Sequence, residues 1–290
     1  MLPLSSQPPQ CRLRFARQPG LGRAPGTDGA TIHVIDLLAG RTTNIINLGK
    51  PVRPHCIKFG PDGLLYVSAE LDRAIYVLDP AQAKVIAKIP TGADQSHMFV
   101  ISPDGTRAYT ANVKPGSVSV VDVKNRSLIK VIPVAEEVQR ISISPDGRHV
   151  YTHDQTKPRI AVIGTGKNEI EKWLDVPATV YSSAITPDGK LLIGTSGQGQ
   201  LFVVDLTTGK LTTTLAIAPG LGEVLIPVSG TFQSGQNIVY TGKAYVSCAK
   251  AGVVEVLNLN KMELEEPIRL TPGADGLAWT AVPGAKLAAR

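Results

Sequence analysis

The sequence predicts an all-β propeller, a ring of four-stranded antiparallel sheets, and three observations support this prediction. Pro-Asp-Gly turns begin at Pro61, Pro103, Pro145 and Pro187, each 42 residues after the last, and the segments around them align without gaps. Every copy holds four short segments with the two-residue alternation of half-buried strands. Four strands in about 40 residues is the length of one propeller blade, which needs neighbouring blades to cover both of its faces.

The elements follow a fixed order within each copy. In the second copy the strand patterns are HMFVIS, RAYTAN, SVSVVDV and SLIKVIPV. The Pro-Asp-Gly turn joins the first two, because Pro sets φ at the first corner and Gly accepts a positive φ. The third pattern ends in an Asp whose carboxylate can accept a hydrogen bond from the backbone two residues on. This Asp is found at Asp36, Asp79, Asp122 and Asp205.

Six blades can be counted along the chain. The fifth copy, GEVLIPVSG to KAYVSCAKA, has an insertion around FQSGQNIVYTG, and a sixth opens at Asp275 with DGLAWTAVPG. The two strand patterns TIHVIDL and TTNIINL near the N-terminus would complete that last blade and close the ring. Its second strand would come from the N-terminal leader or from KLAAR. We therefore expect an irregular leader over residues 1–25 and a propeller domain over 26–290.

Composition argues against several classes of protein. The formal charge is +6, but half of this excess lies in residues 1–28, and the remaining basic residues are scattered without interleaved aromatics, so nucleic acid is not an expected partner. No run of 18 apolar residues is present, which excludes a membrane span by hydropathy, and no signal peptide is visible. Cys11, Cys56 and Cys248 lack the spacing of a disulfide framework or a zinc motif, and the last two are expected to be buried thiols.

The strand motifs LYVSAE, AYTANV, VYTHDQ and AYVSCA, with the preceding SPDG turns, resemble the YVTN-repeat β-propeller family over about residues 26–282. The stretches RPHC, QSHM and GADGLAW look like a bacterial subgroup. Members of this family usually close seven blades, are often periplasmic or on the cell surface, and are similar to lactonase-like and surface-layer propellers. The resemblance leaves two alternatives for this chain. Part of a seventh blade is missing at its N-terminus, or six blades form a complete ring with an arm.

Candidate site residues follow from the geometry of a propeller, in which the first strand of each blade lines the central channel. The positions six residues before each turn proline, and their equivalents in later copies, are all polar and should meet at one channel mouth. Arg140 lies next to one of them and adds a positive charge. The predicted ligand-binding set is His55, His97, Gln139, Arg140, Tyr181, Glu223 and Asp275.

Three interpretations of this set remain open. The side chains could satisfy strand-end backbone groups and channel water. They could bind an anion or another small ligand. They could also bind a divalent metal through His55, His97 and Glu223, with imidazole and carboxylate serving as ligands or as general acid and base. The sequence assigns no catalytic residue, and it lacks GxSxG and CxxCH motifs.

The predicted function is a non-enzymatic YVTN-type propeller that binds a small molecule or a protein ligand at the channel mouth, acting as a monomer. The alternative is a metal-assisted hydrolase or lyase resembling the propeller lactonases. A structural repeat protein of the cell envelope is a third possibility. Among the other histidines, His149 is expected on the surface, and His153 is expected to end a second strand near Asp154 and Lys157 and to take part in a loop hydrogen-bond network.

Overall fold

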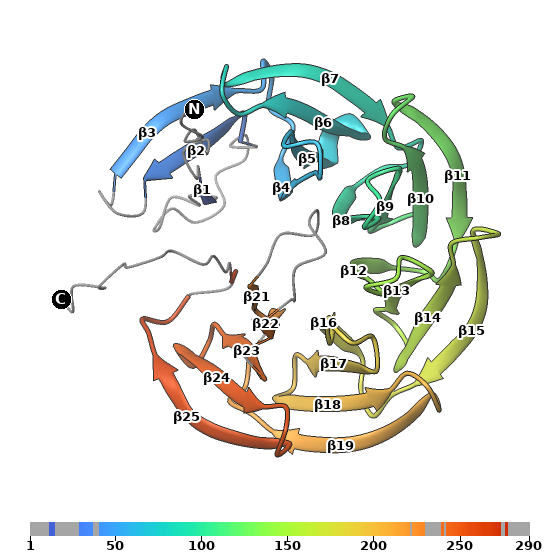
Figure 1. Ribbon diagram of the computed structural model, residues 1–290, viewed down its shortest axis with the longest axis vertical. Coiled ribbons are helices and arrows are strands. Elements are labelled where there is room, and N and C mark those ends of the chain that lie inside the picture. Colours follow the sequence, from blue (N-terminus) through green and yellow to red (C-terminus); the bar gives the residue numbers. More distant parts are fainter. Residues whose placement is uncertain are drawn as a thin grey trace, which may run out of the picture.

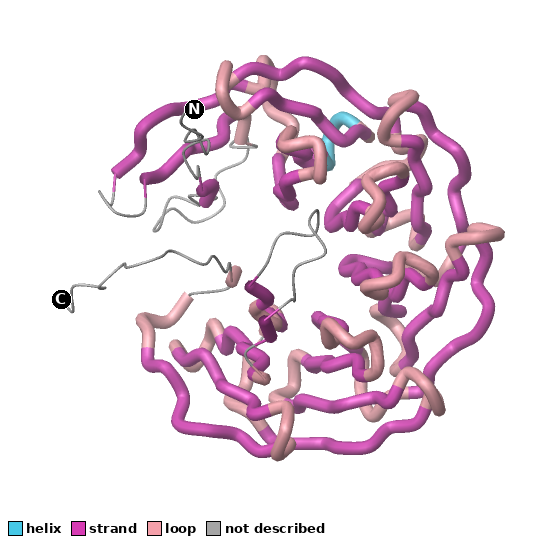
Figure 2. Tube along the Cα trace, viewed as in Figure 1, coloured by secondary structure: helices cyan, strands magenta, loops and turns pink. Residues whose placement is uncertain are grey.

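The computed structural model describes residues 12–14, 29–36, 41–220, 222–229, 239–240, 242–273 and 276–277. In these ranges the regular structure consists of β-strands and one short 3-10 turn, η1 (Glu70–Asp72) (Figure 2). The strands form antiparallel blades around an axis, with the first strand of each complete blade innermost and the fourth outermost (Figure 1). The all-β propeller with six countable blades is confirmed.

Four blades follow one another with the same order of strands. The first contains β4 (Pro54–Phe59), β5 (Leu65–Ala69), β6 (Ala74–Asp79) and β7 (Lys84–Pro90). The second contains β8 (Ser96–Ile101), β9 (Arg107–Asn112), β10 (Ser117–Asp122) and β11 (Ser127–Pro133). The third contains β12 (Val138–Ile143), β13 (His149–Asp154), β14 (Arg159–Gly164) and β15 (Glu169–Asp175). The fourth contains β16 (Val180–Ile185), β17 (Leu191–Ser196), β18 (Gln200–Asp205) and β19 (Lys210–Ala216).

The fifth blade contains the insertion predicted from the sequence. Its four strands are β20 (Val224–Leu225), β23 (Lys243–Cys248), β24 (Val253–Asn258) and β25 (Glu263–Arg269). Between β20 and β23 the inserted segment forms a separate antiparallel pair, β21 (Val228–Ser229) and β22 (Val239–Tyr240). This pair lies closer to the centre of the ring than β23 does (Figure 1).

The remaining blade has three described strands, β1 (Arg12–Arg14), β2 (Thr31–Asp36) and β3 (Arg41–Asn47), in the order β1-β2-β3. β1 comes from the leader, which the sequence suggested is irregular. It takes the place of the second strand of this blade, for which the sequence analysis offered either the leader or KLAAR. A strand edge with unpaired N–H and C=O groups favours such pairing, and a three-residue strand is too short to give a pattern in the sequence. Asp275 and KLAAR fall outside the described residues.

The core consists of five apolar clusters, each of which joins two neighbouring blades. Tyr66 in β5 packs toward the second blade with Phe99, whereas its neighbour Val67 packs toward the β2–β3 blade. The same alternation recurs in the second blade, where Ala108 faces back and Tyr109 faces the third blade. Because successive side chains point to opposite faces, a middle strand is buried on both sides and reads as a continuous apolar run.

The predicted turns are confirmed. Gly63, Gly105, Gly147 and Gly189 all have positive φ, between 71° and 77°. In each turn the Asp carboxylate accepts a hydrogen bond from the backbone N–H two residues on, for example from Thr106 to Asp104 at 3.0 Å. The Asp that ends the third strand also accepts a backbone N–H, from two residues on at Asp79 and Asp205 and from three residues on at Asp122. The described residues contain no helix long and apolar enough to cross a membrane.

Candidate functional site

The inner strands bring most of the predicted positions to the channel side of the ring. His55 lies in β4, His97 in β8, Gln139 and Arg140 in β12, Tyr181 in β16, and Glu223 directly before β20. They form two groups, His55 with His97, and Arg140 with Tyr181 and Glu223. Gln139 is half-buried, and its side chain makes no hydrogen bond to the other described members. Asp275 is outside the described residues.

A bulge or register shift in each of the first four inner strands positions these side chains. In β4, residues 55 and 56 together oppose one residue of β5, since Pro54 pairs with Ala69 and Ile57 pairs with Val67. Equivalent shifts occur between Ser96 and Phe99, between Val138 and Ile141, and between Val180 and Ser182. A bulge bends the strand and re-aims its side chains, and bulges are frequent next to functional sites.

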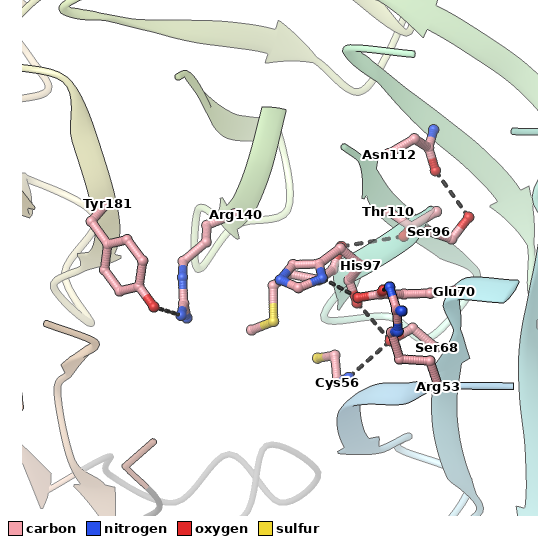
Figure 3. A network of polar contacts seen from close by, with 11 residues as sticks. Arg53, Cys56, Ser68, Glu70, Ser96, His97, Thr110, Asn112, Arg140 and Tyr181 are labelled. Atoms are coloured by element: carbon pink, nitrogen blue, oxygen red, sulfur yellow. Dashed lines mark hydrogen bonds and ion pairs between the residues drawn. The ribbon is translucent and has the colours of Figure 1, made fainter. Parts of the chain in front are cut away.

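His55 and His97 lie ring against ring, with centroids 3.5 Å apart and an interplanar angle of 35°. The third member of this group is Glu70 of η1, whose carboxylate oxygen contacts Nδ1 of His97 (Figure 3). One ligand atom from each of the three lies within 4.8 Å of the other two. His97 and Glu70 are 8% and 6% exposed, and His55 is half-buried. Two imidazoles and a carboxylate at this spacing are a set of donors suited to a divalent metal.

The charge of Glu70 is held by its neighbours. Nη1 of Arg53 lies 3.5 Å from the second carboxylate oxygen. Burial alone raises the pKa of Glu70, but the hydrogen bond from His97 and the electrostatic influence of His97, His55 and Arg53 outweigh it and bring the pKa below its ordinary value. Glu70 is therefore an ionised carboxylate in a largely enclosed position.

Ser68 fixes the backbone under this group. Its hydroxyl accepts a hydrogen bond from the backbone N–H of Cys56 at 2.8 Å and donates one to the carbonyl of His97 at 2.6 Å. These bonds tie β4, β5 and β8 together, so the two histidines are held in a fixed relation across the blade boundary. Cys56 is a buried free thiol, as predicted, and burial raises its pKa.

Arg140 joins three blades in the second group. Its Nη2 donates a 2.6 Å hydrogen bond to the hydroxyl of Tyr181, its guanidinium lies 4.3 Å from the centre of the Tyr181 ring, and its Nη1 is 3.9 Å from Glu223 Oε1. The other carboxylate oxygen of Glu223 accepts the backbone N–H of Leu277 at 3.0 Å. Nε of Arg140 is buried and has no hydrogen-bond partner among the described residues.

His153 lies beside this group, near the end of β13, the second strand of its blade, as predicted. It is fully buried, and its Nε2 lies 2.7 Å from the hydroxyl of Ser183, which is 3.1 Å from the hydroxyl of Ser142. Its Nδ1 has no partner among the described residues. Burial, with the nearby charge of Arg140, lowers the pKa of His153 to about 3, so the imidazole is neutral near pH 7. His149 is half-buried at the surface, 3.4 Å from Glu171.

Glu70 was missed by counting back from the turn prolines, because it is not on a first strand, and the same count left His153 outside the predicted ligand-binding set. A 42-residue step from Glu70 would have shown that the end of the second strand is polar in four consecutive repeats, at Glu70, Asn112, Asp154 and Ser196. Three-dimensional contacts then decide which of these faces the histidines. For the metal set proposed from the sequence, the geometry places Glu70 with His55 and His97, while Glu223 pairs with Arg140.

A separate cleft of about 530 Å³ lies between the third and fourth blades at their Pro-Asp-Gly turns. Its lining includes Asp146, His149, Lys172 and Asp188 and none of the inner-strand site residues. The inner groups are therefore distinct from this surface cleft.

No protein-family model matches the chain, and no curated protein matches it. Among solved structures the chain is similar to hydrazine synthase from Kuenenia stuttgartiensis, with 19% sequence identity and a TM-score of 0.57 over 76% of this chain and 87% of that one. At that identity the likeness shows the fold alone. The comparison supports the propeller-like all-β architecture of this chain, and the resemblance to the YVTN family stays a prediction.

Proposed function

We propose that this chain is a ligand-binding propeller of the YVTN type, and that it takes a small anionic molecule at Arg140. The observation that supports this most directly is a guanidinium that is 10% exposed, lies between side chains of two other blades, and has a buried Nε with no acceptor among the described residues. A buried cation is stable only when it is paired and hydrogen-bonded. Glu223 at 3.9 Å is beyond hydrogen-bond distance, so Arg140 retains capacity for a carboxylate or phosphate.

The ligand class follows from the donors. Arginine offers a planar fork that matches carboxylate and phosphate oxygens, and Tyr181 already orients one arm of it. The buried His153 next to this group is neutral near pH 7, so the positive charge available to an anion here is that of Arg140. A small anion is therefore favoured over an extended protein segment.

Titration calorimetry with acetate, succinate, citrate and inorganic phosphate tests the proposal. We expect at least one of these anions to bind the wild-type chain. Arg140→Lys keeps the charge but loses the fork, and we expect it to bind that anion about 10-fold more weakly or worse. Arg148→Gln, which removes an 81% exposed arginine, is the matched control. Binding by none of the four, or equal loss in the control, would reject the proposal.

The second candidate is a metal-assisted hydrolase or lyase resembling the propeller lactonases, and the group of His55, Glu70 and His97 favours it. A bound metal would supply a Lewis acid and lower the pKa of a coordinated water. Hydrolysis of simple γ- and δ-lactones, measured before and after chelation and again after Zn²⁺ is restored, tests this candidate. Metal-dependent turnover that disappears in Glu70→Gln would support it, and the absence of turnover with Zn²⁺ bound would reject it.

A further inference from the structure

We propose that His55, Glu70 and His97 form a binding site for one divalent transition-metal ion of the zinc class, at the inner boundary of the first and second blades. The proposal is independent of anion binding at Arg140. It also stands without any turnover, because a metal site can serve binding or structure alone.

The first argument is the identity and placement of the donors. β4 supplies His55, β8 supplies His97 and η1 supplies Glu70, so three elements of two blades meet at one point. Their ligand atoms lie within 4.8 Å of one another, and ligands around a tetrahedral zinc ion lie roughly 3–3.5 Å apart, given bonds of about 2.0–2.2 Å. Small side-chain rotations within the group therefore suffice. Two nitrogens and one oxygen, with a position left open, are typical of zinc and similar ions.

The second argument comes from the same position in the next two blades. Asn112, the equivalent of Glu70, bonds to Ser96, Ser117 and Ser119 within its own sheet. Asp154, one repeat later, accepts hydrogen bonds from Thr156, Lys157 and Arg159. Both are held by neighbours on their own blade. Glu70 instead reaches across a blade boundary to His97, so its contacts are not those that the repeat needs for its own folding.

The third argument concerns the shell around the donors. Arg53 lies 3.5 Å from the Glu70 oxygen that does not face His97, which fixes the orientation of the carboxylate with its other oxygen toward His97. Ser68 holds the backbone carbonyl of His97. Partners of this kind orient metal ligands in established sites.

The test uses the full chain, stripped with a chelator and then titrated with Zn²⁺. We expect one equivalent to bind with release of protons, and the affinity to fall as the pH is lowered. Glu70→Gln and His55→Gln should each weaken binding by more than about 100-fold, since even the outer partners of metal ligands change affinity by 10–100-fold. Thermal unfolding without metal shows whether each variant is folded.

His149→Gln is the matched control, because His149 lies beside Glu171 on the surface and represents adventitious binding. Glu223→Gln shows whether Glu223, and not Glu70, is the carboxylate that binds the metal. Retained one-equivalent binding in a folded Glu70→Gln variant, or loss of binding in His149→Gln, would overturn the proposal. Co²⁺ gives an independent readout, since a sulfur-to-metal charge-transfer band would indicate Cys56 as a ligand and would also overturn the assigned set.

Discussion

Single residues at the ends of the second strands show how the same repeat position has acquired different chemistry. Glu70, Asn112 and Asp154 are all buried at the end of a second strand, where an unpaired polar group would be strongly unfavourable. The last two have protein donors within their own blade, and Glu70 has His97 and Arg53. The identity of one residue thus decides whether this position stabilises its own sheet or reaches across to the next blade.

The depressed pKa of Glu70 gives a pH-dependent prediction. Because its folded pKa lies below the unfolded value, its ionised form stabilises the native state above the unfolded pKa, and this contribution is lost as the pH falls through the folded one. The stability difference between wild type and Glu70→Gln should therefore be largest near pH 7 and shrink below about pH 4. Urea unfolding of the metal-free proteins at several pH values measures this difference. A gap that stays constant down to pH 3 would contradict the assigned ion pair.

His153 predicts an effect in a different pH window. Its pKa is lowered from 6.5 to about 3, so between these values the unfolded chain binds a proton that the native protein does not. Stability should then rise with pH across this window, by about 1.4 kcal/mol per pH unit from this one group. His153→Gln should remove that part of the slope in urea unfolding at pH 4, 5, 6 and 7. The surface variant His149→Gln should leave it unchanged, and an equal effect of both would refute the role of burial.

At the scale of elements, the sequence was informative where a local rule decides the structure. The two-residue alternation predicted the strands. The Pro-Asp-Gly motif predicted the turns that join the first and second strands, because φ at Gly63 or Gly105 depends on the turn itself. The bulges in β4 and β8 have no such local pattern, since they depend on pairing with β5 and β9. The contact of Glu70 with His97 likewise depends on how two blades meet. Spacing alone could bring His55 and His97 together, but it could not select Glu70 over Glu223.

Alanine substitutions at two glycines in equivalent turns distinguish the cost of backbone strain from the cost of overpacking between blades. Gly63 and Gly105 both have positive φ, but a Cβ at Gly63 meets nothing within 4 Å, whereas at Gly105 it would overlap the ring of Pro61 in the preceding blade. Gly63→Ala should lower stability by about 1–2 kcal/mol through backbone strain. Gly105→Ala should lose a further 1–3 kcal/mol or so through overpacking. Urea unfolding compares them, and equal losses would show that the turns do not pack between blades.

At the scale of the whole molecule, five of the blade boundaries each have their own apolar cluster among the described residues, so these boundaries can be perturbed one at a time. Phe99 belongs to the cluster between the first and second blades, with Cys56, and Phe202 belongs to that between the third and fourth. Both are fully buried. The geometry at the boundary between the first and second blades should therefore change when Phe99 is substituted and not when Phe202 is substituted. Both side chains nevertheless contribute to the stability of the ring.

Substituting leucine at each phenylalanine turns this independence into a measurement. Phe99→Leu and Phe202→Leu should each reduce stability by about 1–2 kcal/mol, because each removes part of a fully buried ring. If the metal lies between β4 and β8, Zn²⁺ affinity should fall several-fold in Phe99→Leu, since Phe99 packs on Cys56, the residue next to His55. Phe202→Leu should keep the wild-type affinity for Zn²⁺ when the two proteins are compared at temperatures that give them equal stability. Equal weakening in both variants would mean that Zn²⁺ responds to the closure of the whole ring and not to one boundary between blades.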